Sequence, residues 1–252
     1  MNFSKIKNSW FIIPQPNPQA KLRLFCFPYA GGGASVFREW NKELNPKIEI
    51  CTVQLPGREN RLLEPVFNRL QPLINALGQA ILANLNQPFA FFGHSMGSLI
   101  CFELACYLRR VYGLTPVHLF VSGRIAPHLP TSRPAIHNLP PTEFVKELSR
   151  LNGTPTAVLE NRELMELLSP TLRADFAVLE TYTYTESAPF SCGITAFGGV
   201  EDQEVSQEEL LAWKKHTISK FSLQMLPGDH FFINSNRRQL LDLLSKDMML
   251  YI

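Results

Sequence analysis

The chain has 252 residues, of which 45% are hydrophobic and only 18% are charged. Globular proteins carry about 25% charged residues, so this chain has fewer charges than average, and its composition excludes a disordered chain. At this length, one α/β domain and two smaller domains are equally compatible with the composition, and either can bury a substantial core. The 24 Lys and Arg nearly balance the 22 Asp and Glu, and a net charge of +2 without a basic cluster argues against a nucleic-acid partner.

The first apolar stretch, residues 10–13, is stopped by Pro14 well short of the length of a signal peptide. No segment reaches the 18 apolar residues that a membrane span requires. The five cysteines are scattered and never spaced as Cys-x-x-Cys. This pattern favours reduced thiols in a cytoplasmic protein over a metal site or a disulfide.

Short apolar runs then alternate with longer helical patterns, which is typical of an α/β fold with a mostly parallel sheet and helices on both faces. The strands are predicted, in chain order, at residues 22–27, 48–55, 89–93, 117–122, 194–198 and 221–226. The helices are predicted at residues 35–44, 70–85, 96–111, 207–217 and 237–249. Ser206 and Glu209 form an S-x-x-E capping box that marks the start of the fourth of these helices.

The alternation breaks at residues 124–189, which carry eight of the 19 prolines and show only helical periodicity. Three short helices are predicted there, and the last of them begins at an N-cap formed by Ser169 and Pro170. A single crossover connection would not need this length, so we expect a helical lid inserted at about 124–190 into one domain that spans 1–252. Six of its apolar side chains exceed what short surface helices need for anchorage: Phe144, Leu148, Leu164, Leu168, Phe176 and Leu179.

A G-x-S-x-G motif occupies residues 93–97, between a predicted strand and a predicted helix. In this position the motif is typical of a nucleophile elbow, where neighbouring backbone passes so close that only glycine fits two residues before and after the serine. Ser95 is therefore the predicted nucleophile.

A serine hydroxyl needs a base within hydrogen-bonding reach, and in such folds the order along the chain is serine, acid, histidine. Of the five histidines downstream of Ser95, only His230 follows a predicted strand through a turn, at residues 227–229. That turn would present the side chain at the carboxyl edge of the sheet. His230 is therefore the predicted general base.

Three aspartates lie between the serine and the histidine: Asp175, Asp202 and Asp229. Asp175 falls in a predicted lid helix, and Asp229 is the immediate neighbour of the histidine that it would have to face. Asp202 follows a predicted strand through two glycines, so it is the predicted acid, with the adjacent Glu201 as the alternative.

The glycine-rich turn at residues 27–33 could in principle cradle a phosphate, but it matches neither G-x-G-x-x-G nor the P-loop pattern. In a serine hydrolase, such a turn has another use. The backbone N–H of Tyr29, or of Ala30 as second choice, would complete an oxyanion hole with the N–H of Met96.

These motifs together resemble the type II thioesterases of non-ribosomal peptide and polyketide synthesis. The resemblance runs from about residue 22 to 244 and rests on FPYAGGGAS at 27–35, LPGRE at 55–59, GHSMG at 93–97, LPPTEF at 139–144, LNGTP at 151–155, LRADF at 172–176 and PGDHFF at 227–232. It implies an α/β-hydrolase fold with a helical lid and a triad of Ser95, Asp202 and His230.

The resemblance also implies an activity, the hydrolysis of acyl or aminoacyl thioesters on the phosphopantetheine arm of carrier domains through an acyl-Ser95 intermediate. With that activity, the six apolar lid side chains named above become candidates for an acyl-binding and carrier-docking surface. No metal or other cofactor is expected, the carrier domains of a synthetase are the expected partners, and a monomer is expected. Arg58 could contact the phosphopantetheine phosphate, although a solvated loop arginine is the favoured interpretation.

Other functions stay open, because the same triad also cleaves oxygen esters. The alternatives are a lid-bearing esterase or lipase, a medium-chain acyl-carrier thioesterase and a non-catalytic protein that binds carrier domains. The three intact triad residues argue against the last of these.

Overall fold

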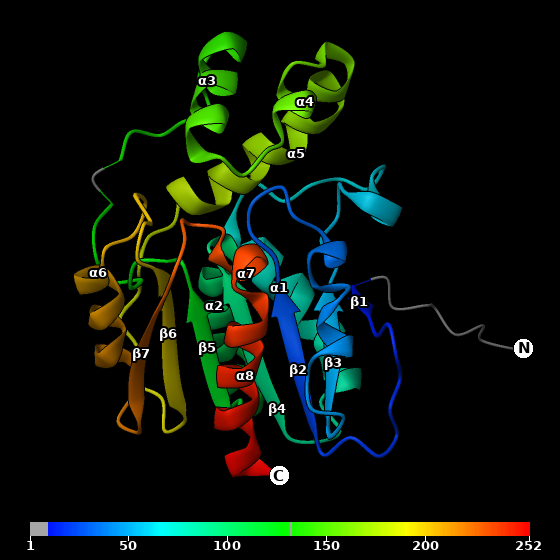
Figure 1. Ribbon diagram of the computed structural model, residues 1–252, viewed down its shortest axis with the longest axis vertical. Coiled ribbons are helices and arrows are strands. Elements are labelled where there is room, and N and C mark those ends of the chain that lie inside the picture. The colour runs from blue at the N-terminus through cyan, green and yellow to red at the C-terminus, as the bar shows by residue number, and fades with distance from the viewer. Residues whose placement is uncertain (1–9, 132) are drawn as a thin grey trace, which may run out of the picture.

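The computed structural model describes residues 10–131 and 133–252, and the rest of the predicted domain, residues 1–9 and 132, lies outside this part. A seven-stranded sheet in the order β1-β3-β2-β4-β5-β6-β7 runs through the molecule (Figure 1). All neighbouring strands are parallel except β1, which is antiparallel to β3. Their bounds are β1 (Phe11–Ile12), β2 (Leu22–Phe27), β3 (Ile48–Val53), β4 (Phe89–His94), β5 (His118–Ser122), β6 (Gly193–Gly199) and β7 (Phe221–Leu226).

The predicted mostly parallel α/β sheet is confirmed, and its six main strands lie within two or three residues of the predicted bounds. β4 and β5 are buried along their whole length, because helices cover both faces of the sheet and such strands need no alternating polar residues. The two-residue β1 was not predicted. It is too short to show a strand pattern and forms only by pairing with the edge of β3.

Two hydrophobic clusters fill the two sides of the sheet. One contains residues of α1 (Leu70–Ile81), α2 (Met96–Tyr112) and α6 (Gln207–Leu211), and the other contains residues of α7 (Phe232–Ser235) and α8 (Arg237–Met248). Figure 1 shows α8 crossing the face of the sheet opposite to α1 and α2.

Several predicted helices are shorter than expected or differ in type. The predicted helix at 35–44 is two separate 3-10 helices, η1 (Ala34–Phe37) and η2 (Trp40–Lys42). The predicted helix at 70–85 ends as α1 at Ile81 and continues as η4 (Leu82–Asn84), and the one at 207–217 becomes η5 (Ala212–His216) after α6. The capping box of Ser206 and Glu209 is present. A further 3-10 helix, η3 (Glu59–Arg61), follows β3, and η6 (Met249–Tyr251) follows α8.

The segment between β5 and β6 forms α3 (Pro141–Leu151), α4 (Thr156–Leu159) and α5 (Arg162–Glu180). Figure 1 shows these three helices gathered beyond one end of the sheet rather than against either face. They share a small hydrophobic cluster of their own, which includes Phe144, Leu148, Met165 and Leu172. This arrangement supports the prediction of an inserted lid.

The prediction of a new helix at Ser169 and Pro170 was wrong, because α5 runs unbroken through Pro170. A proline inside a helix removes one main-chain hydrogen bond and crowds the preceding turn. Here Met165 before the proline and Leu172 after it are buried in the same cluster, so packing holds both halves of α5 in one helix.

Candidate active site

Ser95 lies at a sharp turn between β4 and α2, with φ 53° and ψ −111°. This positive φ is unusual for a residue other than glycine. A Cβ on Gly93 would lie 2.2 Å from the backbone of Gly97, and one on Gly97 would lie 2.1 Å from the carbonyl oxygen of Phe27. Glycine is thus required at both positions, and the local geometry is that of a nucleophile elbow.

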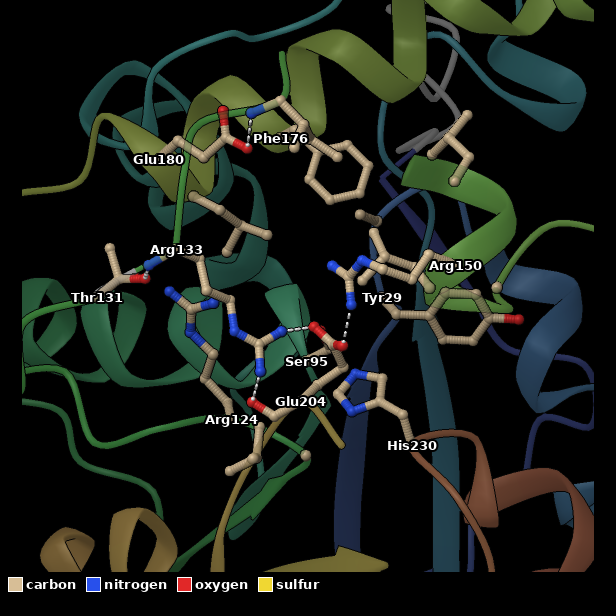
Figure 2. A pocket seen from close by; sticks show the side chains of 18 of the residues that line it. Tyr29, Ser95, Arg124, Thr131, Arg133, Arg150, Phe176, Glu180, Glu204 and His230 are labelled. Carbon is tan, nitrogen blue, oxygen red and sulfur yellow. Dashed lines mark hydrogen bonds and ion pairs between the residues drawn. The ribbon is translucent and has the colours of Figure 1, made fainter. Parts of the chain in front are cut away.

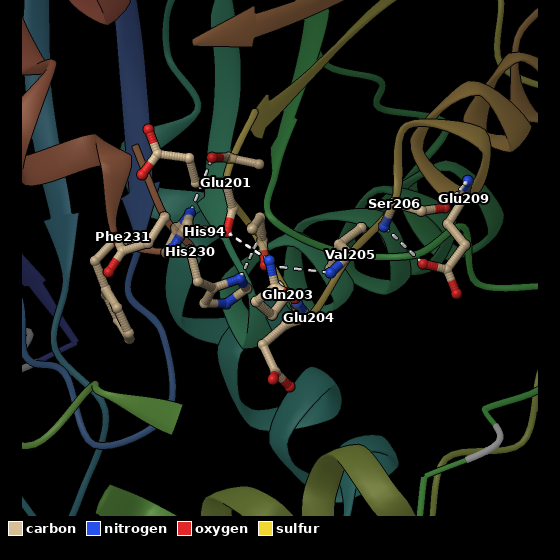
Figure 3. A network of polar contacts seen from close by, with 12 residues as sticks. His94, Glu201, Gln203, Glu204, Val205, Ser206, Glu209, His230 and Phe231 are labelled. Atoms are coloured by element: carbon tan, nitrogen blue, oxygen red, sulfur yellow. Dashed lines mark hydrogen bonds and ion pairs between the residues drawn. The ribbon is translucent and has the colours of Figure 1, made fainter. Parts of the chain in front are cut away.

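His230 and Asp202 come from the loops that follow β7 and β6, at the same edge of the sheet as Ser95. His230 Nδ1 lies 2.8 Å from Asp202 Oδ2, and the Asp202 side chain has no exposed surface. The other carboxylate oxygen, Oδ1, accepts hydrogen bonds from the main-chain N–H groups of Glu204 and Val205 at 2.7 and 3.2 Å. This carboxylate, hydrogen-bonded through both oxygens, can fix the orientation of the imidazole. Figure 3 shows His230 beside the loop that carries Gln203 and Glu204.

The other carboxylates considered from the sequence have different surroundings. Glu201 is exposed, and the hydrogen bonds described for it are made by its main chain. Asp229 accepts hydrogen bonds from the main chain of Phe231 and from the side chain of Asn152. The geometry therefore favours Asp202 over its neighbour Glu201 as the partner of the imidazole.

A second histidine, His94, lies fully buried beside His230, with 5.1 Å between the two ring centroids. Its Nδ1 is 2.9 Å from Ser122 Oγ. Burial, and secondarily the charge of His230, hold the pKa of His94 well below its usual range. His94 is thus neutral at physiological pH and adds no charge next to His230.

Gly123 was not predicted as a site residue. It lies directly after β5, where it allows the imidazoles of His94 and His230 to approach the main chain. A Cβ there would lie 2.7 Å from His94 Cε1 and 3.2 Å from His230 Cε1, and its φ is +58°. The sequence feature that could have indicated its role is its place directly after β5, because β5 pairs with β4, the strand that leads into the elbow.

Ser95, His230, Tyr29 and Ala30 all line one cavity of about 210 Å³ between the sheet edge and the lid helices (Figure 2). The cavity thus brings the predicted nucleophile, base and oxyanion turn together. Met96 is fully buried immediately after Ser95 at the start of α2. Its main-chain N–H is therefore among the helix-terminal groups that have no acceptor within α2.

Three of the six lid side chains predicted to bind acyl groups, Leu148, Phe176 and Leu179, line this cavity. Leu148 and Phe176 also pack in the cluster among the lid helices, whereas Phe144 and Leu168 belong to that cluster without lining the cavity. Leu164 is 39% exposed. An amphipathic pattern shows which side of a helix is apolar but not whether that side faces a cavity or another helix.

Charged side chains line the opposite part of the cavity. Glu204 forms ion pairs with Arg133 and with Arg150 of α3, the latter at 2.8 Å (Figure 2). Burial lowers the pKa of Arg124 to about 10, so this arginine is still protonated at neutral pH. Because Glu204 also donates its N–H to Asp202, these ion pairs connect α3 to the loop that carries the predicted acid.

The interpretation of Arg58 as a solvated loop residue was wrong. Arg58 is only 6% exposed, and both of its terminal nitrogens donate to the carboxylate of Asp175 on α5, at 2.7 and 2.8 Å. A guanidinium engaged in this way is not free to hold a phosphate. The partner lies 117 residues away, so no local pattern could reveal the pair.

Within the described residues, no group of three or more His, Cys, Asp or Glu side chains is arranged to hold a metal ion. No helix of that same part of the chain is long and apolar enough to cross a membrane.

Comparisons with known proteins agree over almost the whole chain. The family model for the Thioesterase domain matches residues 22–248. The chain is 49% identical to linear gramicidin dehydrogenase LgrE of Brevibacillus parabrevis, over 96% of this chain and 94% of that protein. It is 47% identical to gramicidin S biosynthesis protein GrsT of Aneurinibacillus migulanus, over 100% of this chain and 98% of that protein.

Among solved structures, the type II thioesterase BorB from the borrelidin biosynthetic cluster superposes with a TM-score of 0.86 at 34% identity. The superposition covers 94% of this chain and 97% of that one. The predicted resemblance is thereby confirmed at the level of sequence and of fold.

Proposed function

The chain belongs to the thioesterase family and is a thioester hydrolase, and we propose that Ser95, His230 and Asp202 perform the hydrolysis as a catalytic triad. The substrates are acyl and aminoacyl thioesters on the phosphopantetheine arm of carrier domains in non-ribosomal peptide or polyketide synthesis. Removal of stalled groups would return those carriers to use.

In the proposed reaction His230 takes the proton of Ser95 Oγ as the oxygen attacks the thioester carbonyl. Asp202 stabilises the resulting imidazolium through its hydrogen bond to Nδ1. The main-chain N–H groups of Met96 and of Tyr29 or Ala30 stabilise the oxyanion. The thiol leaves with the proton from His230, which then activates a water molecule to release the acid from acyl-Ser95.

One observation carries this proposal. The Asp202 carboxylate holds the His230 imidazole at 2.8 Å, and that imidazole lines the same cavity as a serine on a strained strand-to-helix turn. A protein that only bound carrier domains would have no need for these three features together.

The chemistry requires no cofactor, because the nucleophile, the base and the oxyanion donors are all supplied by the chain. The carrier domain is the proposed partner. The monomeric state and the cytoplasmic location stay predictions from the sequence.

One relative is named a dehydrogenase, but the glycine-rich turn of this chain does not fit dinucleotide binding. The glycine-rich turn after β2 lacks the G-x-G-x-x-G spacing, and the N–H of Gly31 donates to the carboxylate of Asp175 at 2.7 Å. Because this N–H already has a side-chain acceptor, it is not available to bind the pyrophosphate of a dinucleotide.

Replacement of the nucleophile tests the proposal directly. Ser95→Ala should lower thioester turnover by about 10³-fold or more and abolish the acyl-enzyme adduct detected by mass spectrometry. Ser219→Ala, at an exposed serine, is the control and should retain both. A folded Ser95→Ala protein with near-normal turnover would refute the nucleophile assignment.

The substrate class is tested by offering the same acetyl, octanoyl and aminoacyl groups on a phosphopantetheinylated carrier, on a small thiol and as oxygen esters. Strong preference for short acyl and aminoacyl groups on the carrier supports editing. Equal rates on oxygen esters would indicate a general esterase, and a preference for octanoyl would indicate a medium-chain thioesterase.

A further inference from the structure

A buried ion pair connects lid helix α5 to the turn that carries the predicted oxyanion donors. Arg58 and Asp175 have side chains only 7% and 4% exposed. They lie in the LPGRE and LRADF segments, and the proposed triad uses neither of them. Removing two charges from water costs free energy, and a buried ion pair often adds little net stability. Stability alone therefore does not explain why this pair is buried.

The Asp175 carboxylate accepts three hydrogen bonds. Oδ2 receives the N–H of Gly31 and Arg58 Nη1, both at 2.7 Å, and Oδ1 receives Arg58 Nη2 at 2.8 Å. Arg58 Nη1 also donates to the carbonyl oxygen of Gly32 at 3.1 Å. The pair therefore holds both an N–H and a C=O of the two residues that follow Ala30.

The held segment belongs to a tight turn, in which the N–H of Gly32 donates to the carbonyl oxygen of Tyr29 at 2.9 Å. Gly31 has φ +79°, and a Cβ on it would lie 2.6 Å from Leu172 of α5. The turn is thus fixed against the lid helix by close packing as well as by the ion pair. The two N–H groups of this turn that are candidates for the oxyanion hole, those of Tyr29 and Ala30, are positioned by the same contacts.

The pair also determines the net charge next to the predicted oxyanion donors. A lone carboxylate bonded to Gly31, next to those donors, would oppose the negative charge that develops on the substrate oxygen. The guanidinium of Arg58 cancels this charge through two parallel hydrogen bonds. Asp175 can then orient the turn without destabilising the oxyanion.

We propose that Arg58 and Asp175 are positioning residues for the oxyanion hole, which set the Tyr29–Ala30 turn from lid helix α5. This inference rests on the proposed serine mechanism. It predicts that loss of the pair weakens binding of the tetrahedral intermediate more than binding of the substrate.

The test replaces the pair by apolar residues of similar size, in the double variant Arg58→Met with Asp175→Leu. Such replacements of buried ion pairs commonly preserve folding. A matched control removes another buried pair, Arg23 and Glu49, whose side chains are 11% and 4% exposed and which pairs β2 with β3 far from the turn. That control is Arg23→Met with Glu49→Leu.

For the double variant we expect kcat on a small-molecule thioester to fall about 10- to 100-fold, with KM changed less than about threefold. The inhibition constant of an alkyl trifluoromethyl ketone should rise by a similar factor. This ketone is attacked by Ser95 Oγ, whose proton passes to His230, and the ketone oxygen becomes an oxyanion in the hole. The control pair should change thermal stability but neither kcat nor ketone affinity.

Wild-type kcat and ketone affinity in a folded double variant would overturn the inference and leave the triad intact. If the double variant does not fold, Arg58→Gln with Asp175→Asn carries the same test, since it removes both charges with little change of shape. Failure of the ketone to inhibit the wild-type protein would instead refute the proposed oxyanion hole itself.

Discussion

At the scale of single residues, the site depends on side chains whose neighbours leave them one conformation. The Asp202 side chain has no exposed surface, and its two carboxylate oxygens contact the His230 ring and two main-chain N–H groups. Glu201, one residue earlier, is exposed. Two adjacent carboxylates thus have different surroundings because the chain turns between them after β6.

We therefore expect Asp202→Asn to lower kcat by about 10³- to 10⁴-fold, because the amide no longer stabilises the imidazolium or its correct tautomer. Glu201→Gln should change kcat less than about threefold. Steady-state kinetics on one thioester compares the two. The reverse order of effects would transfer the role of the acid to Glu201.

Away from the site, His118 makes stability depend on pH. It is buried, with Nε2 2.9 Å from Thr195 Oγ1 and Nδ1 3.1 Å from the Tyr251 hydroxyl. Burial lowers its pKa to about 4 in the folded protein. Because the unfolded chain binds the proton near pH 6.5, stability from this group is complete above pH 6.5 and is lost as the pH falls towards 4.

Between pH 6.5 and 5, this group should lower the free energy of unfolding by up to about 2 kcal/mol. His118→Gln, which keeps hydrogen-bonding groups but cannot titrate, should show a correspondingly flatter pH dependence in urea titrations. Identical pH slopes for the two proteins would contradict the prediction.

At the scale of elements, the position of the proposed site depends on short connections between strands and helices. The sharp turn between β4 and α2 is possible because Gly93 and Gly97 have no side chains. Their main chains therefore approach neighbouring main chain at distances that a Cβ would prevent. α5 keeps its helix through Pro170 because its two halves bury the same apolar side.

Gly97→Ala should destabilise the protein by about 2 to 3 kcal/mol and reduce activity, because the new Cβ meets the main chain of Phe27 and Pro28, which cannot move aside. Gly113 at the end of α2 is the control, since it has φ +67° with nothing within 4 Å of a Cβ. Gly113→Asn should cost less than about 1 kcal/mol, because Asn tolerates that conformation. Equal losses in thermal denaturation would refute the steric argument.

At the scale of the whole molecule, one sheet edge faces one set of helices, and the site lies between them (Figure 1). Leu148 of α3 and Phe176 and Leu179 of α5 supply the apolar side of the cavity, and Arg124, Arg133 and Arg150 contribute to its polar side. The volume left between the lid and Ser95 should therefore limit the length of the acyl group.

Phe176→Ala should enlarge the cavity and raise kcat/KM for octanoyl relative to acetyl thioesters by about tenfold, since each buried methylene contributes about 0.8 kcal/mol. Leu167→Ala, at a half-exposed position on the same helix, is the control and should leave this ratio unchanged. An unaltered ratio in Phe176→Ala would place the acyl chain elsewhere.

Much of this protein could be predicted from its sequence, because the signals are local. The six main strands follow from short apolar runs, and the proposal of Ser95 and His230 as nucleophile and base rests on a motif and a turn whose residues are adjacent in the chain. The resemblance to type II thioesterases also rests on contiguous motifs. Helix type and extent at residues 34–42 and 162–180 were predicted less well, since packing outweighs local propensity there.

The tertiary structure alone decided which distant groups meet. The ion pair between Arg58 and Asp175, the approach of Gly123 to both imidazoles, and the contact of only three of the six lid side chains with the cavity all involve segments far apart in sequence. Such contacts depend on how helices and loops pack over the sheet edge. No periodicity or spacing along the chain encodes that arrangement residue by residue.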